Sequence, residues 1–399
     1  MAGLNEAPRG NRIHIAFFGL RNAGKSTLVN AFTGQQIAIV SDVPGTTTDP
    51  VSKAMEILPL GPCLVTDTAG LDDEGELGEM RVEKSLKVLD AVDIAVWVWG
   101  SGVSPLQEDA TPSNKAAGRR FSEFLEACRK RNVAVFEYNR GDSVEELKKK
   151  IAAVKLEERM PGLLDGLVKK GDRVLCVVPI DESAPKGRLI LPQQQVIRGC
   201  LDRHAICTVS QVDGLEGLES LGGLGCFDLV ITDSQAFGEV DRKLQTFQTS
   251  KPSKHPKLTS FSILFARQKG DLAELVRGLE AIGSLKDGDT VLVAEGCTHH
   301  RQCNDIGTVK IPKALEKLSG RKLKFEFASG GTFDVPAPVA EGRDGTVRLV
   351  VHCGGCMLTR REMLRRIALA KEAGIPVVNY GLVLARANGI DIQSLIPDS

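Results

Sequence analysis

The sequence of 399 residues has few aromatic side chains, no excess of charge of either sign and no long apolar run. Aromatic residues make up 5% of the chain, and Lys plus Arg equal Asp plus Glu at 51 each. Proteins that bind nucleic acid through a basic groove or an aromatic stacking surface have the opposite composition, so we expect no nucleic-acid partner. No segment approaches the roughly 18–20 apolar residues of a membrane-spanning helix, so we expect no membrane partner either.

The first eleven residues are polar and lack the apolar core of a secretory signal. We therefore expect a cytoplasmic protein, in which thiols stay reduced. This matters because the chain has ten cysteines. Six of them stand singly among apolar neighbours and are predicted to be small buried side chains. These six are Cys63, Cys128, Cys176, Cys200, Cys207 and Cys226.

The remaining four cysteines gather in two short stretches together with three of the six histidines. In a reducing compartment such a cluster favours a metal site over a disulfide. Its members are Cys297, His299, His300, Cys303, His352, Cys353 and Cys356.

The length allows two or three domains, each with its own core. Alternating strand-like and helix-like segments predict an α/β fold. We divide the chain into a nucleotide-binding domain (1–170), a small α/β domain (171–258) and an α/β metal-binding domain (259–399). The middle domain shows no cluster of catalytic side chains.

A phosphate-binding loop is predicted at residues 19–26, which read Gly-Leu-Arg-Asn-Ala-Gly-Lys-Ser. This G-x-x-x-x-G-K-S pattern lies between a strand-like run (12–18) and a helical stretch (27–32), as the motif requires. Its glycines let backbone N–H groups and the helix N-terminus face phosphate oxygens. Lys25 is expected to reach the β- and γ-phosphates, and Ser26 to bind Mg²⁺.

Three further elements follow in the order expected of a GTPase. Asp67-Thr68-Ala69-Gly70 comes directly after an apolar run. This is the place where GTPases carry the carboxylate that completes the magnesium site, so Asp67 is expected to fill that role. The Gly70 N–H is expected to sense the γ-phosphate. The loop between carries three hydroxyls, those of Thr46, Thr47 and Thr48. Asn139-Arg140-Gly141-Asp142 follows a predicted strand. The Asp142 carboxylate can accept hydrogen bonds from guanine N1–H and the 2-amino group, a donor pair that adenine lacks.

These elements resemble the TrmE/Era-like GTPases, which implies a site for GTP or GDP with Mg²⁺. Hydrolysis is assigned to Asn22, Lys25, Thr48 and Gly70. The predicted nucleotide-binding residues are Gly19, Asn22, Ala23, Gly24, Lys25, Ser26, Thr27, Thr46, Thr47, Thr48, Asp67, Gly70, Asn139, Arg140 and Asp142, with Ser26 and Asp67 on Mg²⁺.

The sequence departs from this family in the guanine loop and at the water-positioning residue. Arg140 stands where the family usually has Lys, and no Ser-Ala loop is evident after Asp142. Leu71 occupies the place of the glutamine that orients water in Ras-like enzymes. TrmE-like GTPases use a K⁺ ion held partly by an asparagine at the position of Asn22, so we expect slow, potassium-stimulated hydrolysis.

The metal motif reads C-x-H-x52-H-C-x2-C, and each half follows an apolar, strand-like run. Ligands at the ends of two strands place the centre at the carboxyl edge of an α/β sheet, where such folds bind ligands. The two glycines between Cys353 and Cys356 allow a tight loop that aims N–H groups at sulfur. Thiolates with histidine fit zinc and iron–sulfur centres alike.

The whole chain resembles the HydF family of FeFe-hydrogenase maturation scaffolds, including residues 184–193 and Asp305-Ile306-Gly307. The resemblance implies a 4Fe–4S cluster on Cys297, Cys353 and Cys356, and a middle domain that forms a homodimer or higher homo-oligomer. It also implies a GTP-hydrolysing carrier that receives a di-iron precursor bearing CO and cyanide. The radical-SAM maturases HydE and HydG are the partners that build this cargo, and the apo-hydrogenase HydA receives it.

Three thiolates leave one iron of a cubane without a protein sulfur. The candidates for that position are His299, His352, Glu295, Cys303 and a small exogenous ligand; His352 is as well suited to a hydrogen bond near sulfur. Two other functions stay open: an RNA- or ribosome-associated GTPase with a structural zinc, and a metal-storage module with an inactive GTPase.

Overall fold

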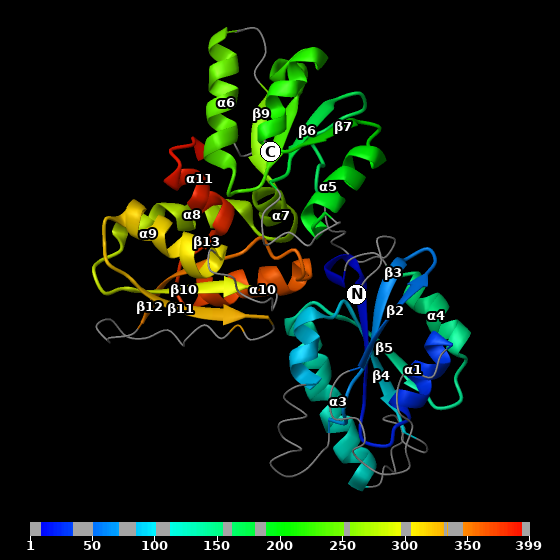
Figure 1. Ribbon diagram of the computed structural model, residues 1–399. Coiled ribbons are helices and arrows are strands. Elements are labelled where there is room, and N and C mark those ends of the chain that lie inside the picture. The colour runs from blue at the N-terminus through cyan, green and yellow to red at the C-terminus, as the bar shows by residue number, and fades with distance from the viewer. Residues whose placement is uncertain are drawn as a thin grey trace. The chain divides into compact units, whose positions relative to one another are not determined.

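The computed structural model describes residues 9–34, 51–71, 85–100, 112–154, 162–179, 189–250, 256–296, 305–330, 333 and 346–392. They belong to two compact units, Met1–Arg159 and Met160–Ser399, which Figure 1 shows in blue to cyan and in green to red. Three sheets flanked by helices confirm the predicted α/β class. Within the described residues no helix is long and apolar enough to cross a membrane.

The first unit is built on a five-stranded sheet of order β2-β3-β1-β4-β5, in which β2 is antiparallel to β3 and the other pairs are parallel. Its strands are β1 (Ile13–Phe18), β2 (Val51–Ile57), β3 (Gly61–Asp67), β4 (Ile94–Trp99) and β5 (Ala134–Asn139). Its helices are α1 (Lys25–Thr33), α3 (Pro112–Lys130) and α4 (Val144–Ala152).

Alternate residues of the central strands serve two separate cores, because successive side chains of a strand point to opposite faces. Ile15 and Phe17 of β1 pack in the cluster that includes α1 and α4. Ala16 and Phe18 pack in the cluster with α3. The scarce aromatic residues gather on the α3 face, where rings lie 4.9 to 5.6 Å apart: Trp97, Trp99, Phe121 and Phe124.

The second unit contains two four-stranded sheets, both fully parallel. One has the order β7-β6-β8-β9 and the other β11-β10-β12-β13. The strands are β6 (Arg173–Val177), β7 (Ile206–Ser210), β8 (Leu229–Thr232), β9 (Lys257–Ser260), β10 (Thr290–Glu295), β11 (Lys324–Ser329), β12 (Val347–His352) and β13 (Val377–Asn379). The helices are α5 (Leu191–Asp202), α6 (Phe237–Ser250), α7 (Phe261–Lys269), α8 (Leu272–Glu280), α9 (Ile311–Ser319), α10 (Arg360–Glu372) and α11 (Tyr380–Ala387).

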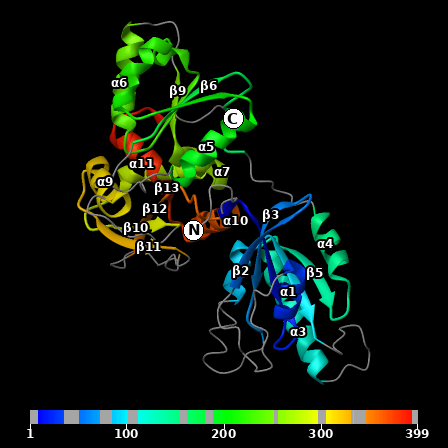
Figure 2. The same cartoon turned by 45° about the vertical axis from the view of Figure 1, so that its right-hand side comes forward.

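Helix α7 joins these two sheets (Figure 2) and is buried on nearly all sides. Ser260, at the end of β9, caps the helix by accepting a hydrogen bond from the Ile263 N–H at 3.2 Å. The helix contacts α5 and β9 on one side and α10, α11 and β13 on the other. One apolar core includes residues of both sheets, so the second unit is a single packed body.

Most of the expected strands are present, but some local predictions differ from the structure. The sequence Ser143-Val144-Glu145-Glu146 predicts a helix start with Ser143 as its cap, and this is confirmed, since the Ser143 Oγ accepts from the Glu146 N–H at 3.3 Å. The apolar spacing of residues 163–170 predicts a helical stretch, but the structure has a series of turns there. The domain boundary that we predict between residues 258 and 259 falls inside β9. The two compact units divide after Arg159, whereas our first predicted boundary lies after residue 170.

Candidate functional site

The phosphate-binding loop follows β1, and helix α1 begins at Lys25, directly after Gly24. The Lys25 Nζ donates hydrogen bonds to the carbonyl oxygens of Gly19 (3.1 Å) and Leu20 (2.7 Å). The loop thus curls around the lysine ammonium group, and the first N–H groups of α1 lie at the same end of the helix. This is the arrangement of a nucleoside-phosphate site.

The two residues expected to bind Mg²⁺ are in direct contact. Ser26 Oγ donates to Asp67 Oδ2 at 2.6 Å. Asp67 is fully buried, and its other oxygen, Oδ1, has no hydrogen-bond partner among the residues that the structure describes. Burial raises the pKa of Asp67, against the effect of the Ser26 hydrogen bond and the Lys25 charge. A buried carboxylate oxygen of this kind is costly unless a cation or donor satisfies it, so the pair fits a hard divalent ion.

The segment Asp67–Leu71 is tied to the phosphate loop. The Leu71 N–H donates to the Gly19 carbonyl at 3.2 Å. A Cβ at Gly70 would come within 2.9 Å of the Arg21 backbone nitrogen, so only glycine fits there. The hydroxyl-bearing loop with Thr46, Thr47 and Thr48 lies outside the described residues.

The guanine-loop residues form a closed turn at the end of β5. The Asp142 Oδ2 accepts hydrogen bonds from Asn139 N (2.8 Å) and Nδ2 (3.2 Å), and Tyr138 donates its hydroxyl to the Asp142 carbonyl at 2.8 Å. Because β5 and β1 run parallel in one sheet, this turn and the phosphate loop share its carboxyl edge. Arg140 is exposed.

The cysteine loop of the second unit begins where β12 ends, beside the end of its neighbour β10. The Cys353 Sγ accepts hydrogen bonds from two backbone N–H groups, Gly296 at 3.2 Å and Gly355 at 3.4 Å. Gly355 has φ +64°, a conformation that glycine adopts without strain. The expectation that the glycine loop aims N–H groups at sulfur is confirmed.

The predicted third thiol belongs to Cys297, which follows Gly296 in the chain and lies outside the described residues, as do His299, His300 and Cys303. In the part that the structure describes, no group of three or more His, Cys, Asp and Glu side chains is arranged to hold a metal ion. Burial raises the pKa of Cys353 to about 11 and also raises that of Cys356. Both are therefore neutral thiols that a metal centre must deprotonate. With one more sulfur, the donor set fits a thiolate-bound centre.

A buried lysine holds this loop from α7. Lys269 is fully buried, and its Nζ donates to the carbonyl oxygens of Gly355 (3.3 Å), Cys356 (2.9 Å) and Leu358 (2.7 Å). Burial lowers the pKa of Lys269 to about 8, whereas the nearby sulfurs of Cys356 and Cys353 act to raise it. A cation thus sits beside the two thiols with carbonyl oxygens around it.

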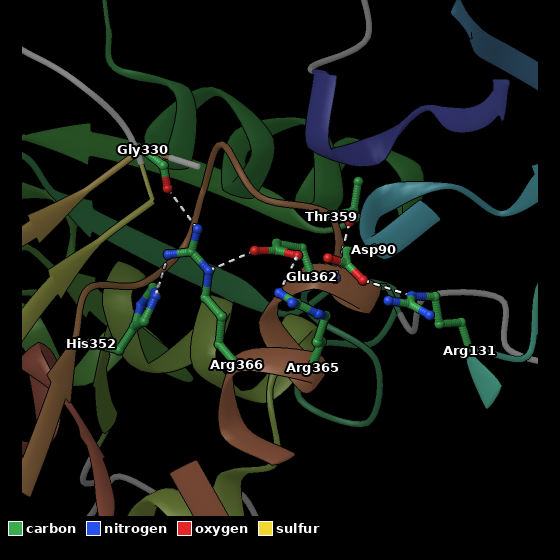
Figure 3. Close-up of polar contacts among 8 residues, drawn as sticks. All are labelled: Asp90, Arg131, Gly330, His352, Thr359, Glu362, Arg365 and Arg366. Atoms are coloured by element: carbon green, nitrogen blue, oxygen red, sulfur yellow. Dashed lines mark hydrogen bonds and ion pairs between the residues drawn. The ribbon is translucent and has the colours of Figure 1, made fainter. Parts of the chain in front are cut away.

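His352 lies in a buried polar network, which Figure 3 shows. Its Nδ1 is 2.9 Å from the Cys353 carbonyl, which only accepts, so Nδ1 carries the proton. Its Nε2 therefore accepts from Arg366 at 3.1 Å. Burial, and then the Arg366 charge, lower the pKa of His352 to about 4. In this arrangement both ring nitrogens are engaged; ligation by His352 stays a prediction and requires the loss of one of these contacts.

Arg366 is itself held by several partners. It donates to Glu362 Oε1 at 2.8 Å and to the Gly330 carbonyl at 2.6 Å, and lies 5.0 Å from the Phe333 ring. These guanidinium N–H groups donate to oxygen atoms or to the imidazole nitrogen. The hydrogen bonds offset the free-energy cost of burying the Arg366 charge.

Glu295, another candidate for the open position, ends β10 close to the loop. It is largely buried, and the Tyr380 hydroxyl donates to its Oε1 at 3.4 Å. Gly307, from the Asp305-Ile306-Gly307 segment, packs against both of these groups. Asp305 Oδ2 accepts from the Thr308 N–H at 2.9 Å and so shapes the turn that leads into α9.

Comparison with known families adds a decisive observation to this geometry. Two family models match the second unit: "Hydrogen maturase F dimerization domain" over residues 163–270 and "Hydrogen maturase F tetramerization domain" over residues 273–397. Together they span more than half of the chain and include α7 and the cysteine loop. A third, "50S ribosome-binding GTPase", matches residues 14–137. The chain belongs to the hydrogen maturase F (HydF) family. Its second unit matches the dimerization and tetramerization models of that family, and its first unit matches a GTPase model.

Other relatives of this HydF chain are nucleotide-binding proteins. It is 42% identical over 104 residues to GTPase Der of Xylella fastidiosa (strain M23), and the aligned region covers 25% of this chain and 22% of Der. It is 27% identical over 238 residues to the tRNA modification GTPase MnmE of Syntrophomonas wolfei, and the aligned region covers 58% of this chain and 48% of MnmE. Since the chain spans about a fifth to a half of these relatives, their activities as whole proteins do not carry over.

Among solved structures, a variant of Aquifex aeolicus Era bound to GDP and aluminium fluoride aligns with 79% of this chain and 93% of its own. The sequence identity is 14% and the TM-score is 0.25, too low to support any argument.

Lys269 and Arg366 were not predicted as site residues of this HydF chain. Lys269 follows an arginine and a glutamine at the polar end of a helix, where a lysine is ordinarily solvated. Arg366 stands four residues after Glu362, a spacing typical of an exposed helical ion pair. The sequence signal for Lys269 was the short apolar stretch at residues 263–266, which indicates a helix with a buried middle turn.

We expect Lys269→Met to loosen the cysteine loop. Each lost hydrogen bond from a charged donor costs about 1.5–3 kcal/mol, and removal of the buried charge offsets part of this, so we expect a net loss on the order of 2 kcal/mol. Hydrogen exchange in residues 353–358 should rise in the metal-free protein. Lys257→Met, at an exposed lysine of β9, is the control and should leave exchange unchanged. Wild-type protection in Lys269→Met would show that the loop does not depend on this lysine.

Proposed function

We propose that this HydF chain is a GTP-hydrolysing scaffold that binds a 4Fe–4S cluster through Cys297, Cys353 and Cys356. It receives a di-iron precursor bearing CO and cyanide and transfers it to the hydrogenase. One observation carries the cluster assignment. The Cys353 sulfur accepts N–H groups from its own loop and from Gly296, the residue just before Cys297.

The residues of the loop suit a thiolate-bound iron–sulfur cluster in two ways. N–H groups directed at sulfur stabilise thiolate charge, and the buried Lys269 supplies a positive charge next to the same sulfurs. A cluster held by three thiolates keeps one iron without a protein sulfur, which provides a place for an incoming group. His299, His352, Glu295 and Cys303 are the chain's own candidates for that iron.

The nucleotide site is proposed to use the residues assigned from the motifs. Lys25 contacts the β- and γ-phosphates of GTP, Ser26 and Asp67 hold Mg²⁺, and Asp142 accepts hydrogen bonds from guanine. The contact of Ser26 with Asp67 and the unsatisfied Asp67 oxygen support the Mg²⁺ assignment. The radical-SAM maturases HydE and HydG, the apo-hydrogenase HydA and a homodimeric state complete the proposal, with the family's dimerization and tetramerization models as support for self-association.

Anaerobic purification tests the cluster. We expect iron and acid-labile sulfide near the ratio of a cubane, with a visible thiolate-to-iron charge-transfer band. Cys297→Ser, Cys353→Ser and Cys356→Ser should each lose most of the iron and fail to support activation of apo-HydA. Cys226→Ser, in the same unit but outside the motif, is the matched control and should behave as wild type. Zinc without sulfide in the wild-type protein would instead favour a GTPase with a structural zinc site.

Potassium dependence tests the role of Asn22, which adopts φ +55° at the tip of the phosphate loop. We expect GTP turnover to be slow and clearly faster in K⁺ than in Na⁺ at equal ionic strength, because the chain has leucine at position 71 and needs another charge at the transition state. Asn22→Ala should remove the difference between the two salts. Equal rates in both salts for the wild-type protein would contradict the potassium mechanism.

A further inference from the structure

Three thiols outside the proposed cluster site converge in the sheet β7-β6-β8-β9. Cys176 belongs to β6, Cys207 to the neighbouring strand β7, and Cys200 to α5, the helix that connects them. The Cys176 and Cys207 sulfurs are 3.7 Å apart, and Cys207 is also hydrogen-bonded to Cys200. Cys207 is thus in contact with both other thiols.

The three sulfurs differ in their access to solvent. Cys176 and Cys200 are fully buried, whereas Cys207 is partly exposed on β7, an edge strand of the sheet. Apolar side chains from α5, α7 and β8 surround them. A reagent in solution can therefore reach Cys207 first, and the two shielded thiols remain beside it.

The hydrogen bonds within the group favour the same order of reaction. Either sulfur of the Cys176–Cys207 hydrogen bond can be the donor, and hydrogen bonding within the group lowers the pKa of Cys207 and raises the pKa of Cys176 and Cys200. The thiolate is the nucleophilic form of cysteine, and the lowered pKa favours that form at Cys207, the most accessible of the three sulfurs.

We propose that Cys207 is a thiol-exchange site that reacts with low-molecular-weight disulfides and closes a disulfide bond with Cys176 or Cys200. The Cys207 thiolate attacks one sulfur of the small disulfide, breaks its S–S bond and releases one small thiol. The second cysteine loses its proton, attacks the mixed disulfide at Cys207 and releases the other small thiol. Two cysteines are oxidised and one small disulfide is reduced to two thiols, so electrons and protons balance.

The two sulfurs are close, but the bond also needs a shift of the backbone, because Cys176 lies opposite Val209 and not opposite Cys207 in the register of β6 and β7. A disulfide needs its sulfurs about 2.05 Å apart, and the Cys176 and Cys207 sulfurs already touch at 3.7 Å. Either bond would fasten the edge strand β7 to the interior of its sheet or to α5. The same apolar cluster contains Phe265 of α7 and, packed against it, Cys356, so the two sulfur sites have a core in common.

Peptide mapping of the full-length protein tests the proposal. The freshly reduced, metal-free chain is incubated with glutathione disulfide, its free thiols are alkylated, and trypsin is added. Cleavage after Arg173, Lys186, Arg198, Arg203 and Arg242 places the three cysteines on separate peptides. We expect the peptide 204–242 cross-linked to 174–186 or to 199–203, two hydrogen atoms lighter than the separate peptides, and released by dithiothreitol.

Variants assign the bond and distinguish it from other thiols. Cys207→Ala should abolish both cross-links, while Cys226→Ala, on the same tryptic peptide, should keep them. If Cys207→Ala does not fold, Cys176→Ala and Cys200→Ala should each remove one cross-link only. Two results would overturn the proposal. In the first, glutathione stays on Cys207 and no cross-link forms. In the second, Cys207 remains reduced while Cys226 is modified. The result does not depend on cluster binding, because the experiment uses metal-free protein.

Discussion

The second unit depends on one buried ammonium group. Lys269 ends α7 with its Nζ bound to three carbonyl oxygens of the cysteine loop, and Arg360, at the start of α10, returns a hydrogen bond to the Gln268 carbonyl of α7 at 2.6 Å. A buried cation is costly unless its donors are satisfied, and here only the folded loop satisfies them. The charge therefore specifies the shape of the loop and fixes α7 against it. In the proposed cluster site, the same charge would balance the negative charge of the thiolates.

Both proposed sites lie at the carboxyl edges of parallel sheets, where such folds bind ligands. In the first unit, β1, β3 and β5 end in the phosphate loop, Asp67 and the guanine turn. In the second unit, β10 and β12 end in Glu295 and His352. Apart from β1, each of these strands ends in a polar residue, and the apolar residues before it hold the backbone in place.

The sequence predicted those parts of the sites that depend on local pattern. Apolar runs located β10 and β12, and the loop glycines indicated N–H groups at sulfur, because both follow from backbone rules. Contacts between distant segments were not predictable in the same way. Lys269 meets residues 355–358 only after two sheets have packed together, and the three carbonyl groups that it binds lie 86 to 89 residues away in the sequence.

The same limit explains the thiols of the middle sheet. Cys176, Cys200 and Cys207 look like separate buried residues in the sequence, and each is buried or partly buried as expected. The parallel β6–α5–β7 crossover brings them together, which a residue-by-residue reading does not reveal. The turns at residues 163–170 were mistaken for a helix because their apolar spacing suits either, and packing in the core decides between them.

The reduction potential of the anaerobically prepared protein tests the central claim that the Lys269 charge is coupled to the proposed iron–sulfur cluster. Reduction adds a negative charge, which a nearby cation stabilises. Lys269→Met should therefore shift the potential to a more negative value, while Lys269→Arg, which keeps the charge, should stay closer to wild type. A potential in Lys269→Met that is unchanged or more positive would contradict the account.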